Sequence, residues 1–214
     1  MILNRNDYDN MILKILNDTS KFKQLNSNPT LLREGQLQRF LLKLKKKGVF
    51  DDENGNFNEN AYKKVYPVGS GMGKIYGLPK THKLKEGNTV QNLTVRPIIS
   101  SIGTYNYEIA KYLTNKLSPY IPTEFTVKDS FTFVKLVSEI NMSDKYLVSY
   151  DVNSLFTSIP LKQTIDIAVN VICTNEPNSK ISEIELKKLF YFATSQGASF
   201  GQFIYGVSRE FLVR

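Results

Sequence analysis

Apolar residues recur at helical spacing along much of the chain. In two early stretches they fall three or four positions apart, which places them on one face of a helix with 3.6 residues per turn. The residues that carry this pattern are Met11, Ile12, Ile15 and Leu16 in the first stretch, and Leu37, Phe40, Leu41 and Leu44 in the second. The pattern predicts a helix capped at Asn6 or Asp7 and a longer helix after Pro29 that Gly48 ends.

The same spacing predicts further helices in the second half of the chain. One begins at Thr104 and ends at Ser118-Pro119, one is capped by Asp129, and one follows Pro160. The side chains expected on their buried faces are Ile109 and Leu113, then Phe133, Leu136, Val137 and Ile140, then Ile165, Ala168, Val169 and Ile172. Ser182 and Glu185 have the spacing of a capping box, which predicts a last helix.

Short apolar runs predict a few strands between these helices. Residues 74–76 and 93–96 flank a polar loop, which is typical of a hairpin, and this hairpin would carry Lys80, Lys83, Lys85 and Arg96. Residues 145–151 form another apolar run, which ends on Asp151. The predicted fold class is α+β, mostly helical, with a small antiparallel sheet.

Positive charge is concentrated in the first half of the chain. Residues 1–100 hold 17 Lys and Arg against 9 Asp and Glu, a balance of +8, whereas residues 101–214 hold 11 of each. Such an excess suits a polyanionic partner such as nucleic acid. It is equally compatible with a solvated, lysine-rich surface, and Lys43 to Lys47 also suit a helix C-terminus on dipole grounds.

Composition excludes several classes of protein and site. One Cys and one His, Cys173 and His82, exclude an internal disulfide framework and a Cys/His zinc site within these 214 residues. The single Cys also fits an intracellular setting. No apolar run approaches the ~18 residues of a membrane span, and the polar opening residues are unlike a signal peptide.

The glycine-rich stretch at residues 69–74 invites comparison with a phosphate-binding loop. The spacing of its glycines is wrong for a P-loop, and Ile75 follows Lys74 where Ser or Thr is required. We therefore expect a flexible connection. His82, a few residues on, is expected to be a hydrogen-bonded structural imidazole.

Asp151 is the most informative candidate for chemistry. Polymerases place carboxylates at strand ends because two divalent metals must hold the attacking and leaving oxygens of nucleotidyl transfer. On its own, Asp151 is also well explained as an ordinary strand-terminal Asp that caps a turn.

Three blocks in order decide between these interpretations. YGLPKTHK at 76–83, VRPIIS at 95–100 and VSYDVNSLFTSIPL at 148–161 together resemble the reverse transcriptases of Penelope-like retroelements. More distantly they resemble telomerase and group II intron enzymes. The lead-in at 4–22, NRNDYDNMILKILNDTSKF, is also similar to the Penelope-like pattern, so the resemblance spans about residues 5–207.

The resemblance implies a right-hand polymerase architecture and a role for five residues. Residues 1–60 would be a helical N-terminal extension, 61–145 the fingers, and 146–214 a partial palm. Lys80 and Arg96 would contact the incoming triphosphate, a sensible pairing of a point charge with a planar, bidentate cation. Asp151 and the backbone carbonyl of Val152 would bind Mg²⁺ (or Mn²⁺). Phe156 would pack where a ribose 2′-hydroxyl sits, and it is otherwise an ordinary core aromatic.

The chain departs from this pattern after Gly206-Val207. The family continues into a Gly-Ser-Pro-Leu block and an Asp-Asp turn that completes the metal site, but here residues 208–214 read SREFLVR. Residues 152–214 hold one Asp, Asp166, in a predicted helix. We therefore expect a truncated or frameshifted fragment that is inactive alone and prone to self-association, because palm strands and the thumb would be missing.

Three functions remain open on this basis. The complete enzyme would be an RNA-directed DNA polymerase whose partners are an RNA template, a DNA primer and dNTPs. We expect no membrane among its partners. The alternatives are a nucleic-acid-binding protein without chemistry and a non-functional relic. A nuclear location would fit the family's work on chromosomal DNA, although the KLKKK run at 43–47 is too short to serve as a signal.

Overall fold

The structure, a computed structural model, is mixed α+β, and it describes residues 3–81, 93–141, 143–152, 155, 159–195 and 197–207. The elements in chain order are α1 (Arg5–Leu16), β1 (Phe22–Gln24), α2 (Thr30–Lys46), α3 (Glu59–Val65), β2 (Gly73–Pro79), β3 (Val95–Ser100), α4 (Tyr107–Leu117), the 3₁₀ turn η3 (Ser118–Tyr120), α5 (Ser130–Ser138), α7 (Leu161–Asn175), α8 (Glu183–Thr194), β4 (Gly197–Phe200) and β5 (Phe203–Val207). None of the helices in these described residues is both long and apolar enough to cross a lipid bilayer.

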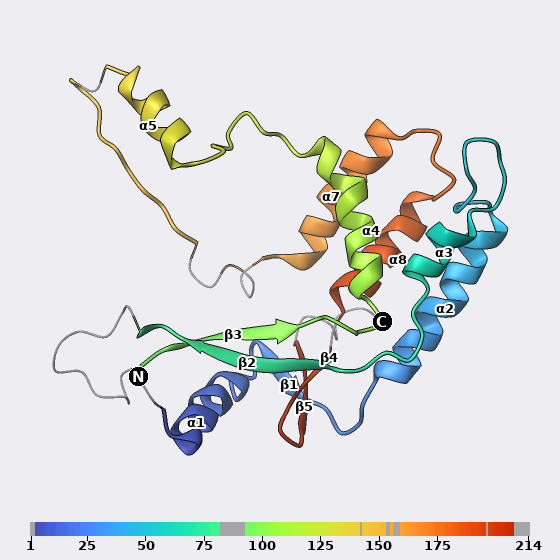
Figure 1. Ribbon diagram of the computed structural model, residues 1–214, viewed down its shortest axis with the longest axis horizontal. Helices are drawn as coiled ribbons and strands as arrows, with labels where there is room; N and C mark the ends of the chain where they lie inside the picture. The colour runs from blue at the N-terminus through green and yellow to red at the C-terminus, as the bar shows by residue number, and fades with distance from the viewer. Residues whose placement is uncertain are drawn as a thin grey trace.

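Five strands form one sheet in the order β1-β5-β4-β2-β3 (Figure 1). All neighbouring pairs are antiparallel except β2 and β4, which run parallel, with Gly73 opposite Ala198. The sheet is therefore mixed, and the prediction of a purely antiparallel sheet was wrong. The parallel contact joins segments more than 120 residues apart in sequence, which explains why local patterning missed it.

Two separate apolar cores hold the molecule together. The larger core lies among α2, α3, α4, α7 and α8, and it includes Ile165, Val169 and Ile172 from the predicted buried face of α7. The fourth predicted residue, Ala168, is also buried. The smaller core lies between α1 and the sheet, where Ile12 and Leu16 contact strand residues such as Ile75 and Val95. The helices α2, α3, α4, α7 and α8 therefore form one body, and the sheet with α1 forms the other (Figure 1).

The contact between α1 and β2 requires glycine at position 77. A Cβ added to Gly77 would lie 2.3 Å from Ile12 Cδ1 and 2.3 Å from Val95 Cγ1, well inside van der Waals contact. The Gly77 amide also donates a hydrogen bond to the Tyr8 hydroxyl at 2.6 Å. One face of the hairpin is thus closed by α1, which leaves the other face open.

Residues 121–141 and 143–152 form an arm that projects from the two bodies (Figure 1). Asp129 caps α5 as predicted, its carboxylate accepting a hydrogen bond from the Thr132 amide at 2.7 Å. The expectation of a buried face on α5 was wrong, because α5 has no buried residue and Phe133, Leu136 and Ile140 are exposed. The predicted strand at 145–151 was also wrong: this segment belongs to no strand, because no other described segment lies beside it to pair with.

Candidate nucleotide-binding face

The β2–β3 hairpin was predicted, and its register separates two faces. Ile75, Gly77 and Pro79 of β2 face α1, whereas Lys74, Tyr76 and Leu78 alternate with them and are exposed. Successive side chains of a strand point to opposite sides, so this alternation defines one open face. The partners of Lys74, Tyr76 and Leu78 across the ladder are Ser100, Ile98 and Arg96.

Lys80 and Arg96 lie on this open face at neighbouring positions. Arg96 is directly opposite Leu78, and the Lys80 amide donates to the Thr94 carbonyl at 2.8 Å, which extends the same register by one residue beyond β2. Lys80 is therefore the diagonal neighbour of Arg96, a separation that long side chains can bridge. The structure thus brings together the two residues expected to hold a triphosphate.

Tyr76 belongs to the same face and was not among the candidate residues. It is 44% exposed and lies opposite Ile98, two positions from Leu78. An exposed ring beside cations is the combination that binds an unpaired base together with its phosphate. The signal in the sequence was the alternation of KIYGLPK at 74–80, which places Tyr76 on the side of Lys74 and Lys80.

The glycine-rich connection before β2 is tied to α2 by a buried carboxylate. Glu34 accepts hydrogen bonds from the amides of Gly69 at 3.2 Å and Ser70 at 2.7 Å. Burial alone would raise the pKa of Glu34, but the bonds from Ser70 and Gly69 outweigh it and the pKa is lowered. Two amides of the loop that was compared with a phosphate-binding loop therefore bind a protein carboxylate, and this end of the connection is fixed.

The structure does not bring Asp151 to the hairpin. Asp151 and Val152 are exposed on the projecting arm, and among the described residues neither makes a hydrogen bond or ion pair with the hairpin. Phe156 and His82, as well as Lys83 and Lys85, lie outside the described residues.

The expected metal requires more ligands than the arm provides. Among the residues that the structure describes, no group of three or more His, Cys, Asp or Glu side chains is placed to hold an ion. A two-metal centre needs several carboxylates around both ions. Asp151 with the Val152 carbonyl therefore does not amount to the site that nucleotidyl transfer requires.

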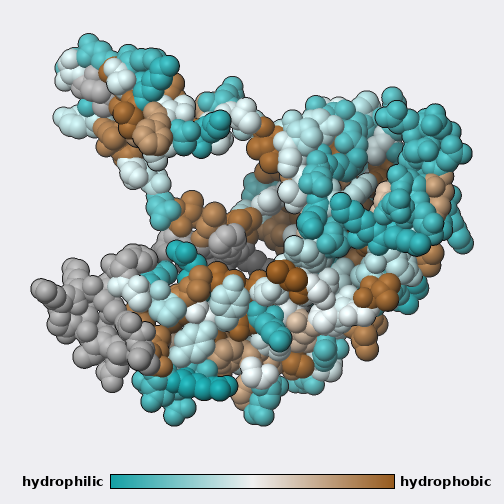
Figure 2. Space-filling view, viewed as in Figure 1, coloured by the Kyte–Doolittle hydropathy of each residue, from teal (hydrophilic) through white to brown (hydrophobic). Residues whose placement is uncertain are grey.

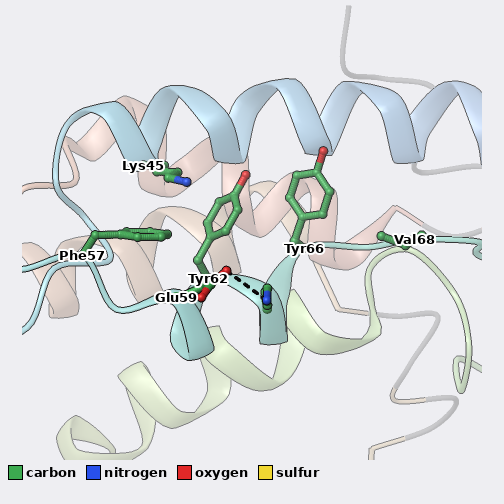
Figure 3. A pocket seen from close by; sticks show the side chains of 7 residues that line it. Lys45, Phe57, Glu59, Tyr62, Tyr66 and Val68 are labelled. Atoms are coloured by element: carbon green, nitrogen blue, oxygen red, sulfur yellow. Dashed lines mark ion pairs between the residues drawn. The ribbon is translucent and has the colours of Figure 1, made fainter.

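The basic end of α2 is engaged within the protein. Lys43 and Lys47 form ion pairs with Glu185 of α8 at 3.3 and 2.6 Å. Lys45 lies 4.0 Å above the centre of the Phe57 ring, beside Tyr62, in a shallow hollow of about 350 Å³ between α2 and α3 (Figure 3). A large part of this charge therefore stabilises the fold, which favours the interpretation of residues 43–47 as a structural helix end.

Comparison with known proteins does not identify a family for this chain. A scan of protein-family models and searches of curated proteins and of solved structures found no match to the chain.

Proposed function

We propose that this chain contains the nucleotide-binding fingers and the first palm segment of a reverse transcriptase, an RNA-directed DNA polymerase. The observation that carries the proposal is the placement of Lys80 and Arg96 as diagonal neighbours on the open face of the β2–β3 hairpin. A triphosphate concentrates several negative charges, and an ammonium beside a guanidinium fork matches them by charge and by hydrogen-bond geometry.

The order of three sequence blocks supports the same proposal. Lys80 lies in YGLPKTHK, Arg96 in VRPIIS, and Asp151 in the block that resembles the first catalytic segment of the palm. In this proposal Asp151 and the Val152 carbonyl are ligands of Mg²⁺ or Mn²⁺, and Phe156 favours deoxynucleotides. A bound ion would stabilise charge that develops on the transferring phosphate.

The residues of this chain alone do not complete that centre. A single Asp cannot hold two ions, and residues 152–214 provide no Asp-Asp pair. We therefore assign these residues to substrate binding, with RNA template, DNA primer and dNTP as the ligands of the complete enzyme.

The test is a titration of the protein with a fluorescent deoxynucleoside triphosphate. Replacing Lys80 or Arg96 by Ala should weaken binding about tenfold to a hundredfold, the effect of losing one or two charged hydrogen bonds. Lys74→Ala is the matched control. It removes the same charge from the same face, but about 20 Å from Lys80 and about 13 Å from Arg96 along the hairpin.

Two results would contradict the proposal. One is binding that Lys80→Ala and Arg96→Ala leave unchanged. The other is an equal loss in Lys74→Ala, because it would indicate attraction to the general positive charge of the protein.

The second candidate function is nucleic-acid binding without chemistry, and the position of Tyr76 favours it. An exposed ring between Lys74 and Lys80 suits an unpaired base with its phosphates. This function predicts salt-sensitive binding of single-stranded RNA that Tyr76→Ala weakens and Asp151→Ala does not change. Free dNTP should not compete, which separates this function from the first.

A further inference from the structure

The projecting arm exposes large apolar side chains over its whole length. Phe125 and Phe131 are 88% and 87% exposed, and Tyr146 and Tyr150 are 94% and 92% exposed. Figure 2 shows hydrophobic residues gathered on the arm, away from the two bodies. So many large apolar side chains exposed on one part of the chain indicate a site that another protein surface covers.

The backbone from Lys145 to Asp151 is also unpaired within the part of the chain that the structure describes. It runs as an extended trace after α5 (Figure 1), and among the described residues its amides and carbonyls make no backbone hydrogen bond. An extended, unpaired segment is a template for another strand. Its alternation places Tyr146, Val148 and Tyr150 on one side, and the other side carries Lys145, Leu147, Ser149 and Asp151.

The sequence of this segment is complementary to itself in antiparallel register. If two copies pair about Val148, Lys145 of each lies opposite Asp151 of the other, and Tyr146 lies opposite Tyr150. Opposite charges and aromatic rings are both favourable cross-strand pairs. A twofold axis requires this kind of reciprocity, in which residue i contacts j and j contacts i.

We propose that a second copy of this chain covers the arm, and that the two copies pair antiparallel through residues 145–151 with the twofold axis at Val148. The two strands then present Tyr146, Val148 and Tyr150 of both copies on one side of the ribbon, where the exposed side chains of α5 pack. This inference concerns the chain as given and uses neither Lys80 nor Arg96, but it places Asp151, a metal ligand of the complete enzyme in the proposed function, in an ion pair between the two copies.

The exposed area of the arm is large enough for such a dimer. Buried aromatic side chains contribute about 150–250 Å² each, so Phe125, Phe131, Tyr146 and Tyr150 of two copies provide about 1,200–2,000 Å². Stable interfaces bury about the same total. A two-stranded ribbon alone is marginally stable, so the packing of α5 is a necessary part of the interface.

The first test is charge reversal, followed by light scattering after size-exclusion chromatography. The parent chain should run as a dimer. Lys145→Glu or Asp151→Lys should each weaken it about tenfold to a hundredfold, because each puts two like-charge pairs into the ribbon. The double variant carrying Lys145→Glu and Asp151→Lys should restore the dimer. Lys64→Glu is the matched control: it reverses an exposed charge on α3, outside the arm, and should have little effect.

The second test is register-specific cross-linking in a Cys173→Ala background. Residue 148 lies on the proposed axis, directly opposite residue 148 of the second copy. The Val148→Cys variant should therefore form a disulfide-linked dimer under mild oxidation. Tyr146→Cys should not, since antiparallel pairing puts the two copies of residue 146 about 13 Å apart along the strands.

Three results would overturn the proposal. They are a monomeric parent chain, a dimer that single charge reversal leaves intact, and a double variant that stays as weak as the single variants. Triphosphate binding is measured separately, so failure of the dimer leaves the proposed function standing.

Discussion

Replacing Glu185 by glutamine tests the contact that joins α2 to α8. Glu185 is 6% exposed, forms ion pairs with Lys43 and Lys47, and closes a capping box with Ser182. Burial alone would raise the pKa of Glu185, but hydrogen bonds from Lys47 and from Ser182 outweigh burial and lower it to about 2. Glutamine keeps the shape and can still complete the capping box, so the variant isolates the charge.

The expected loss of stability follows from that pKa. A fall from 4.5 to about 2 corresponds to about 3 kcal/mol of extra stability for the ionised folded state. The side chains of Lys43 and Lys47 are 64% and 40% exposed, so water screens part of this interaction and we expect Glu185→Gln to cost about 2 kcal/mol at pH 7. In a domain of this size that is a fall of about 4–8 °C in Tm.

The pH dependence has a definite sign. A lowered folded-state pKa contributes stability that is fully present above the unfolded pKa near 4.5 and is lost as the pH falls toward about 2. Glutamine does not titrate, so the gap between parent and variant should narrow by about 1 kcal/mol between pH 7 and pH 4.

The assay is urea unfolding followed by far-UV circular dichroism at several pH values. Glu183→Gln is the matched control on the same helix, because Glu183 is exposed and its ion pair with Lys187 should contribute less than about 0.5 kcal/mol. Equal stability of the parent and Glu185→Gln at pH 7, or a gap that does not change with pH, would show that the charge of Glu185 does not stabilise the fold.

Three further predictions concern the sheet, a helix cap and activity. Gly77→Ala should destabilise the protein by about 1–3 kcal/mol, because its Cβ meets Ile12 and Val95, and a thermal melt equal to the parent's would contradict this. Ser182→Ala should cost about 1 kcal/mol in urea unfolding by removing the cap of α8; no loss would show that Glu185 holds the helix start without it. The chain with a primed RNA template, dNTPs and Mg²⁺ should extend no primer, and extension that Asp151→Ala abolishes would contradict that prediction.

Local chemistry made some parts of this fold predictable. The apolar face of α7, the capping box at Ser182 and the hairpin at 74–96 each depend on residues close together in sequence, and the structure confirms them. Features of this kind can be predicted from a short stretch of sequence, without information on the rest of the chain.

Other parts depended on partners that lie far away in sequence. The run at 145–151 has the composition of a strand, but a strand exists only where another backbone pairs with it, and the described residues provide none. The three residues of β1 show no periodicity and become a strand by pairing with β5 at the other end of the described chain.

The candidate site was predictable where its residues are close together in sequence, and not where they are far apart. Lys80 and Arg96 were expected on one hairpin, and the register places them on one face. The partner of Lys43 and Lys47 was not visible in the sequence, because Glu185 lies 138 residues after Lys47. Residues 43–47 therefore looked more available for nucleic acid than they are.

The most direct test of the proposed function is to map where a nucleotide binds. A photoactivatable azido-dATP is irradiated with the protein, and the labelled peptides are identified by mass spectrometry with unlabelled dATP as competitor. We expect competable label on the peptides that contain residues 73–81 or 95–100, the open face that carries Tyr76, Lys80 and Arg96. Competable label confined to the helical body, or no competable label, would contradict a nucleotide site on the hairpin.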